Sequence, residues 1–199
     1  MMSGGKRIAV LVSGSGTNLD ALLRAGDLGG DIVLVGADRA EAYGLVRARE
    51  AGVDTLVVPF RAYQARDEWD AALFNRVAEY EPDLVVLAGF MRILSGRWTS
   101  RWPMLNTHPA LLPSFPGARA VRDALAYGVK VTGATVNFVI EEVDAGPIVL
   151  QEAVGVEPGD TVDTLHARIK VVEHGLLRQA VTLFCHDRLA VNGRQVRIT

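Results

Sequence analysis

The first ninety residues of the chain alternate between short apolar runs and longer stretches with helical spacing. The apolar runs are continuous, which is typical of strands that are buried on both faces of a sheet. Helices between such strands cover the two faces, and the strands pair in parallel. The sequence therefore predicts strands over 7–12, 31–38, 55–60 and 83–90 and helices over 18–26, 40–52 and 66–82.

The pattern changes after residue 100. An extended segment at 103–109 precedes a predicted helix, and two β-rich stretches follow that could pair across the turn-like sequence EEVDAG. A long amphipathic stretch then predicts a helix, and an Asn-Gly pair predicts a small closing hairpin. The predicted helices cover 119–128 and 161–187, the β-rich stretches cover 130–140 and 146–156, and the hairpin turns at Asn192 and Gly193.

Composition excludes several classes of protein. The 199 residues carry a formal net charge of −2, so no basic surplus drives binding to nucleic acid. The single cysteine, Cys185, allows no internal disulfide or multi-cysteine metal site, and its apolar neighbours predict a buried thiol. No apolar run is long enough for a membrane span. The first sixteen residues lack a small-residue cleavage site and predict a strand, not a signal peptide, so we expect a cytoplasmic protein.

A glycine-rich stretch, VSGSGTNL at 12–19, lies between the first predicted strand and helix. Backbone N–H groups at a helix start form an anion site, and glycines let a phosphate approach closely. The third position of the dinucleotide pattern G-x-G-x-x-G falls on Leu19, and no Gly-Lys-Ser/Thr follows, so neither common nucleotide motif is present. A tight turn without a ligand is the alternative.

The stretch LNTHPALLPSFPG, at 105–117, holds a histidine between prolines. Asn106 and His108 are two residues apart, so in an extended segment both side chains point to the same side. Pro109 restricts His108 to extended geometry. An amide donor beside an imidazole can stabilise an oxyanion, and the imidazole can also move a proton near neutral pH.

The histidine still requires a partner that orients it, and Asp144 is the best candidate. Asp144 lies in the Gly- and Pro-containing turn between two β-rich stretches. A carboxylate close to the imidazole would favour the imidazolium. The alternative is that His108 is an ordinary loop histidine and Asp144 an ordinary turn residue. His166 and His174 are eight residues apart, which does not match a zinc pair, so they are interpreted as polar-face residues.

Six stretches together resemble the folate-dependent formyltransferases, in the same order along the chain, from about residue 7 to 190. They are SGSGTNL, DLVVLAGFMRILS, LNTHPALLPSFPG, VTGATVNFV, VDAGPIVLQ and EHGLL. The resemblance is greatest to the members that formylate glycinamide ribonucleotide (GAR) in purine synthesis. It implies one α/β domain over 1–199, with a mostly parallel, twisted sheet of about seven strands flanked by helices. The half at 1–100 would be Rossmann-like and phosphate-binding, and the half at 101–199 catalytic and folate-binding.

The resemblance also implies roles for individual residues. The formyl group of 10-formyltetrahydrofolate, the co-substrate, would pass to the amine of GAR without a metal. Asn106 and His108 would stabilise the tetrahedral oxyanion and relay the proton, and Asp144 would hold His108 in its working state. GAR would contact Gly16, Thr17, Asn18, Lys170 and Glu173. Folate would contact Arg66, Met91, Arg92, Ile93, Leu94, Asn106, Ile140, Glu141, Glu142, Val143 and Asp144.

The chain departs from the family pattern at three places. Arg119 and Asn137 stand where histidine is frequent in the family, and the connection 95–106 is about two residues shorter. The family also implies a cis Leu112–Pro113 bond and a monomer or homodimer. Formyltetrahydrofolate deformylase and methionyl-tRNA formyltransferase are alternatives within the superfamily, and the absence of their additional domains argues against both. A nucleotide-binding module without catalysis is the alternative from another class, and it leaves Asn106, His108 and Asp144 unexplained.

Overall fold

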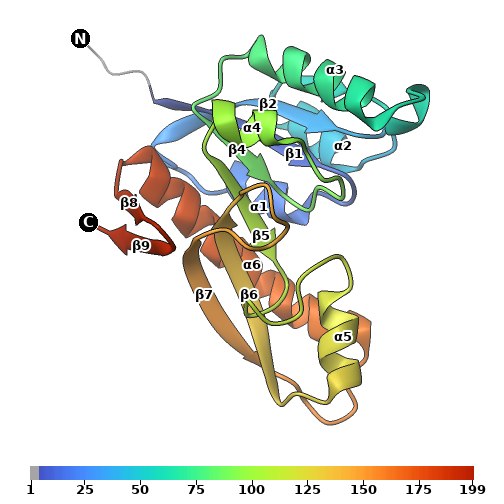
Figure 1. Ribbon diagram of the computed structural model, residues 1–199, viewed down its shortest axis with the longest axis vertical. Helices are drawn as coiled ribbons and strands as arrows, with labels where there is room; N and C mark the ends of the chain where they lie inside the picture. The colour runs from blue at the N-terminus through green and yellow to red at the C-terminus, as the bar shows by residue number, and fades with distance from the viewer. Residues whose placement is uncertain (1–4) are drawn as a thin grey trace. The chain divides into compact units, whose positions relative to one another are not determined.

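The computed structural model describes residues 5–199 (Figure 1). The domain prediction and the argument against a signal peptide both include residues 1–4, which lie outside this range. The described residues divide into two compact units, one ending at Leu105 and the other covering Asn106–Thr199. The fold-class prediction is confirmed, because the molecule is α/β with mostly parallel strands and helices packed against them.

The first unit is a parallel β-structure in the strand order β3-β2-β1-β4. Its central strands are almost completely buried, as the continuous apolar runs predict. The strands are β1 (Lys6–Val12), β2 (Gly30–Ala37), β3 (Thr55–Val57) and β4 (Leu84–Leu87). The helices are α1 (Thr17–Leu23), α2 (Gly44–Glu50), α3 (Arg66–Ala78) and α4 (Gly96–Arg101), with a 3₁₀ turn η1 at Phe60–Ala62.

Several elements of this unit are shorter than predicted: the strand predicted over 83–90 ends at Leu87, and the helix predicted over 40–52 begins at Gly44. Two further differences have clear physical causes. The strand predicted over 55–60 ends at Val57, because Pro59 cannot donate a ladder hydrogen bond and the chain turns into η1. The segment 95–106, which the sequence suggests is a connection, contains helix α4. That helix is fixed by Asp70 of α3, which accepts hydrogen bonds from Ser95 N–H (3.0 Å), Ser95 Oγ (2.6 Å) and Trp98 Nε1 (3.1 Å).

The second unit is built on an antiparallel pair. Strands β6 (Val131–Phe138) and β7 (Ile148–Gly155) pair with each other, as the sequence suggests, and the structure places Val131 opposite Gly155. The closing hairpin, β8 (Leu189–Asn192) and β9 (Gln195–Ile198), joins β7 through a parallel pair of Ile148 and Gln195. The described residues therefore form nine strands, against about seven expected, because the hairpin extends the sheet. Strand β5 (Met104–His108) begins at the end of the first unit and continues into the second.

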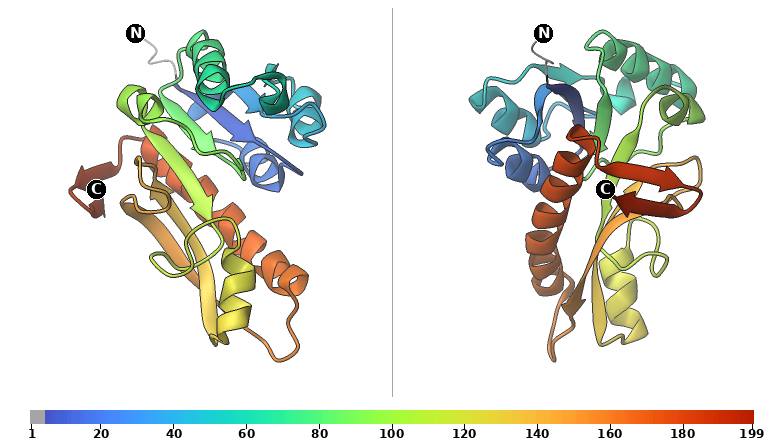
Figure 2. Two further views of the ribbon diagram at one scale, coloured as in Figure 1. Left: turned by 45° about the vertical axis from the view of Figure 1, so that its right-hand side comes forward. Right: turned by 90° about the vertical axis from the view of Figure 1, so that its left-hand side faces the viewer.

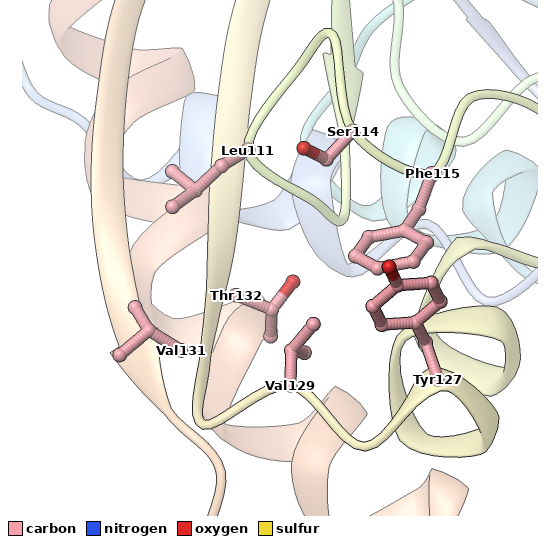
Figure 3. Close-up of a pocket in the computed structure, with 7 residues that line it drawn as sticks. All are labelled: Leu111, Ser114, Phe115, Tyr127, Val129, Val131 and Thr132. Atoms are coloured by element: carbon pink, nitrogen blue, oxygen red, sulfur yellow. The ribbon is translucent and has the colours of Figure 1, made fainter.

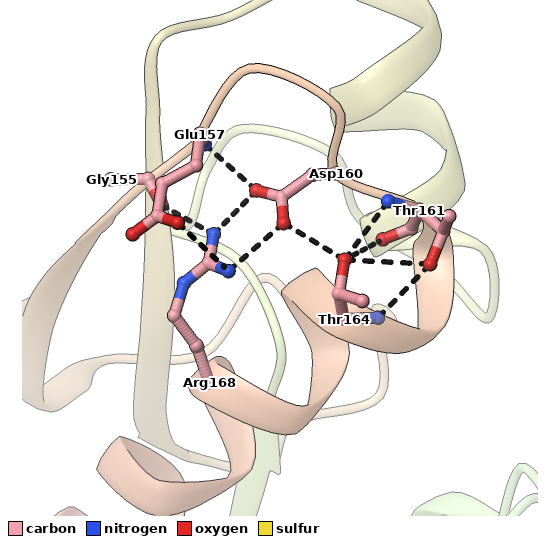
Figure 4. A network of polar contacts seen from close by, with 6 residues as sticks. All are labelled: Gly155, Glu157, Asp160, Thr161, Thr164 and Arg168. Atoms are coloured by element: carbon pink, nitrogen blue, oxygen red, sulfur yellow. Dashed lines mark hydrogen bonds and ion pairs between the residues drawn. The ribbon is translucent and has the colours of Figure 1, made fainter.

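The remaining elements of the second unit are α5 (Ala120–Tyr127) and the long helix α6 (Val162–Cys185), which packs along β6 and β7 (Figure 2). Helix α6 begins where the Thr161 hydroxyl accepts a hydrogen bond from Thr164 N–H, and the Thr164 hydroxyl accepts one from Thr161 N–H. Asp160, just before the helix, pairs with Arg168 about two turns further along (Figure 4). The hydrogen bonds from Arg168 hold the pKa of Asp160 well below its ordinary value.

Candidate active site

Strand β5 places the two predicted reactive side chains on one face. Asn106 and His108 alternate with Thr107, which points to the opposite face. His108 is buried, with 4% of its surface exposed, and Asn106 is half-buried. The prediction that the extended segment brings the amide and the imidazole to one side agrees with this strand geometry.

Asp144 supplies the carboxylate on which these groups converge. Its Oδ2 lies 3.4 Å from His108 Nδ1, and its Oδ1 lies 3.5 Å from Asn106 Nδ2. The N–H of Gly117 donates a short hydrogen bond of 2.7 Å to Oδ2. The Asp144 side chain is only 10% exposed, so these contacts operate in a medium of lower polarity than water. Asn106, His108 and Asp144 therefore form one cluster in the second unit.

Both ring nitrogens of His108 face acceptors. Nε2 lies 2.9 Å from the carbonyl oxygen of Phe115, and because a carbonyl can only accept, Nε2 is the donor. Nδ1 faces the Asp144 carboxylate, which also only accepts when it is ionised. Nε2 therefore donates to Phe115, and Nδ1 lies beside a carboxylate that would stabilise a positive charge on the ring, so the position of His108 suits proton transfer.

Two residues near the cluster adopt left-handed backbone conformations. Phe115 has φ 54° and Asp144 has φ 55°, which is uncommon for side chains other than glycine. The chain that follows Asp144 also passes close to β6, because a Cβ at Gly146 would lie 1.7 Å from the Phe138 carbonyl oxygen. Two irregular segments, and not helices or strands, thus position Asp144 and the Phe115 carbonyl that contacts His108. The Leu112–Pro113 bond, in the same segment as Phe115, is cis, as the family resemblance implies.

Three groups that contact the cluster are not predicted by the sequence as its hydrogen-bond partners. The Phe115 carbonyl and the Gly117 N–H are backbone groups, so no residue type signals them. Asn137 was noted only as a departure from the family pattern, yet it is buried, and its Oδ1 lies 3.5 Å from Asn106 Nδ2. Its own Nδ2 donates to the Phe138 carbonyl. Asn137 thus occupies an acceptor position beside Asn106, whereas Arg119 is exposed at the start of α5.

The residues predicted to contact GAR from α6 have different surroundings. Glu173 is 3% exposed and accepts a hydrogen bond of 2.9 Å from Thr107 Oγ1, on the face of β5 opposite to His108. Burial raises the pKa of the Glu173 carboxyl, while Thr107 and the charge of Lys170 act in the opposite direction. Lys170 is half-buried one turn earlier on α6. A cation and a buried carboxylate lie together there, a combination that suits a ligand with both anionic and hydroxyl groups.

The glycine loop in the first unit requires glycine for two reasons. Gly16 has φ 68°, and a Cβ there would lie 2.5 Å from Gly44 Cα. Thr17 and Asn18 follow at the start of α1. Asn18 is buried, and its Oδ1 has no hydrogen-bond partner among the described residues. A buried amide with an unused polar atom is a frequent feature of sites that a ligand or water completes.

The predicted folate segment 91–94 is held by charged side chains of the same unit. Arg92 Nε donates to Asp38 Oδ2 at 2.7 Å, and its guanidinium lies 4.0 Å from the ring centroid of Phe60. Burial favours a raised pKa for Asp38, but hydrogen bonds from Arg39 and Arg92 lower it below its ordinary value. Arg66 donates to the Ile93 carbonyl at 2.7 Å. Arg92 and Arg66 therefore fix the shape of this segment.

Exposed apolar side chains gather in the predicted folate segments of both units. Met91 and Ile93 are 62% and 54% exposed in the first unit, and Ile140 and Val143 are 40% and 47% exposed in the second. Glu141 and Glu142 between them are also exposed. Large apolar residues that remain open to solvent on a loop commonly mark ligand contacts.

Residues 5–199 contain no cluster of three or more His, Cys, Asp or Glu side chains that could hold a metal ion. Within the same range, no helix combines the length and apolar character needed to cross a bilayer.

Comparison with known proteins gives one consistent result. The formyl transferase family matches residues 6–181. Phosphoribosylglycinamide formyltransferase of Mycobacterium tuberculosis is 50% identical over 192 residues, covering 94% of this chain and 89% of that protein. The crystal structure of glycinamide ribonucleotide transformylase 1 from Symbiobacterium toebii has a TM-score of 0.95 and 51% identity, covering 99% of this chain and 95% of that one. The bovine trifunctional purine biosynthetic protein adenosine-3 is 46% identical over 200 residues, and this chain spans about a fifth of its length.

Proposed function

Because the chain belongs to the formyl transferase family, we propose that it transfers the formyl group of 10-formyltetrahydrofolate to the amine of GAR. The products are formyl-GAR and tetrahydrofolate, in de novo purine biosynthesis. The observation that carries the proposal is the convergence of Asn106 and His108 on the Asp144 carboxylate.

In the proposed reaction the GAR nitrogen attacks the formyl carbon, a new C–N bond forms, and the carbonyl oxygen becomes an oxyanion. Asn106 Nδ2 donates a hydrogen bond to that oxygen as its charge develops, and protonated His108 donates a second one through Nδ1–H, which lies beside Asp144. The bond from the formyl carbon to the folate nitrogen then breaks, and the proton lost by the attacking amine passes through His108 to the departing nitrogen. Asp144 orients the imidazolium and balances its charge.

The binding roles are proposed separately for the two units. In the first unit, Gly16, Thr17 and Asn18 bind the phosphate of GAR, and Arg66 and residues 91–94 bind folate. In the second, Lys170 and Glu173 bind GAR, and Asn106 and residues 140–144 bind folate. The exposed apolar residues at 91, 93, 140 and 143 support the folate assignment, and the glycine-rich turn before Thr17 and Asn18, with its backbone N–H groups, supports the phosphate assignment. No metal is required, because the imidazolium and the amide stabilise the charge.

We also propose that the enzyme works in the cytoplasm as a monomer or homodimer on small molecules, without nucleic-acid or membrane partners. The net charge of −2 and the single cysteine support this assignment.

The test is to incubate the protein with 10-formyltetrahydrofolate, with and without GAR, and to measure tetrahydrofolate and formyl-GAR. Equal amounts of both products, formed only when GAR is present, are expected. Tetrahydrofolate released without GAR would make the protein a deformylase, with water as the nucleophile. His108→Ala is the control for catalysis by the protein, and it should abolish product formation. A non-catalytic binding module would form no product before or after this substitution.

A further inference from the structure

A cavity of about 370 Å³ that is open to solvent on the side of Tyr127 and Val131 lies in the second unit, apart from the cluster of Asn106, His108 and Asp144 (Figure 3). The irregular segment after β5 forms one wall, the end of α5 another, and the start of β6 the third. Its volume is within the range of sites that take small molecules. The lining residues are Leu111, Ser114, Phe115, Tyr127, Val129, Val131 and Thr132.

The lining determines which ligands can bind. None of the seven side chains is charged, so the cavity does not suit a phosphate or a carboxylate. Phe115 and Tyr127 face each other edge to face, with ring centroids 5.9 Å apart. Aromatic edges and branched aliphatic side chains favour a flat, neutral ring system.

One polar atom in the cavity is buried and unused. Thr132 is 2% exposed, and its Oγ1 has no hydrogen-bond partner among the described residues. Figure 3 shows this hydroxyl turned toward the space bordered by Phe115 and Tyr127. Because a buried hydroxyl is costly without a partner, a ligand with one hydrogen-bonding group would be favoured at this position.

Phe115 connects this cavity to the reactive histidine. Its ring lines the cavity, while its carbonyl oxygen lies 2.9 Å from His108 Nε2. Its left-handed backbone conformation, φ 54°, is strained for a phenylalanine, so the local packing must hold it in place. A ligand packed against the ring would stabilise this position of the loop and keep Nε2 bound to the carbonyl.

We infer that the cavity is a regulatory site for a small, neutral aromatic molecule with one hydrogen-bonding group, and that its occupation restrains His108 through Phe115. The binding step is independent of the proposed function, whereas the effect on turnover rests on it.

Indole is the probe, and indene, which has the same shape without the N–H group, is its matched control. Saturable indole binding is expected by calorimetry, with indene about tenfold weaker because one hydrogen bond is absent. Thr132→Val, which keeps the shape of the side chain, should weaken indole binding about tenfold and leave indene unchanged. Val129→Phe, which fills the cavity, should abolish binding of both.

Two measurements test the connection between the cavity and His108. The imidazole NMR signals of His108, identified by their loss in His108→Asn, should shift on addition of indole whether or not the protein formylates GAR. If it does, saturating indole should change kcat about threefold or more while the KM for GAR stays constant, because the ligand holds the loop whose Phe115 carbonyl contacts His108.

Three results would overturn the inference. Absence of saturable binding would remove the site, and binding that Thr132→Val and Val129→Phe leave unchanged would place it elsewhere. Binding in the cavity without any change in the His108 signals would disprove the connection through Phe115. If Val129→Phe fails to fold, as judged by circular dichroism, Thr132→Val and indene still decide the outcome.

Discussion

The two compact units hold their candidate residues in different ways. In the first unit, the charged side chain of the predicted folate segment, Arg92, is bound to Asp38, which leaves backbone and exposed apolar groups such as Met91 for a ligand. In the second unit, Asn106 and His108 converge on one nearly buried carboxylate. The first arrangement suits binding alone, whereas the second also suits proton exchange, so the largest effects on kcat are expected from substitutions in the second unit.

The largest effect is expected at Asp144. Asp144→Asn keeps the shape of the side chain but removes the negative charge that faces His108 Nδ1, so kcat should fall about a hundredfold or more. The loss corresponds to about 2.7 kcal/mol in the activation barrier. Steady-state kinetics with GAR and 10-formyltetrahydrofolate measure it, with the folded state checked by circular dichroism.

Glu152→Gln is the matched control, because it removes one exposed carboxylate from β7 of the same unit. Its kcat should stay close to that of the wild type. If Asp144→Asn also stayed within about twofold of the wild-type value, the role assigned to Asp144 would be wrong.

The second effect concerns the first unit and should appear in stability. Gly16→Ala forces a side chain into a left-handed conformation and brings its Cβ to 2.5 Å from Gly44 Cα. The free energy of unfolding should fall by about 2 kcal/mol, measured by urea denaturation. Gly14→Ala is the control, since a Cβ there meets no atom within 4 Å, and it should change stability little. Equal effects of the two substitutions would contradict the packing argument.

The regular parts of the fold could be predicted because they repeat a simple pattern. Buried parallel strands such as β1 and β4 appear as continuous apolar runs, and the antiparallel partners β6 and β7 flank a recognisable turn. Helix α4 could not be predicted in this way. It has six residues, and its position depends on hydrogen bonds from Ser95 and Trp98 to Asp70, which is distant in the sequence.

The candidate site could be predicted from the sequence only where side chains form it. Asn106, His108 and Asp144 have residue types and spacing that point to proton transfer, and the structure brings them together. The Phe115 carbonyl that binds His108 is a backbone group, and any residue at that position would supply the same atom. Its position is set by how the segment folds, and no pattern of residue types encodes that directly.

A third prediction uses the buried carboxylate of Glu173, whose pKa is raised chiefly by burial. The folded state therefore binds the proton on Glu173 more tightly than the unfolded state does. The stability that this proton contributes is fully present below pH 4.5, the ordinary pKa, and is lost as the pH rises through the raised pKa of the folded state. Glu173→Gln removes the loss of stability at high pH, because glutamine does not ionise, and its side-chain oxygen can still accept the hydrogen bond from Thr107. The variant should be more stable than the wild type at pH 8, and the difference should vanish near pH 4.5.

Thermal unfolding at several pH values measures this difference, with Glu50→Gln as a control on the exposed surface of α2. A constant difference between Glu173→Gln and the wild type from pH 4.5 to 8 would contradict the linkage. The KM for GAR, measured on the same variant, tests separately whether the carboxylate contacts substrate.

The smallest effect is expected at the start of α6, outside every proposed ligand contact. Thr161 accepts a hydrogen bond from Thr164 N–H, and removing such a cap costs about 1 kcal/mol of stability. Thr161→Ala should therefore lower the free energy of unfolding by about that amount, while Thr161→Ser, which keeps the hydroxyl, should lose less. Both variants should retain wild-type kcat, because the cap acts on the helix end and on none of the groups that contact Asp144. A clear fall in kcat for Thr161→Ala alone would mean that this helix end also controls the cluster of Asn106, His108 and Asp144, and the stability of the α6 end could not be treated as independent of the proposed chemistry.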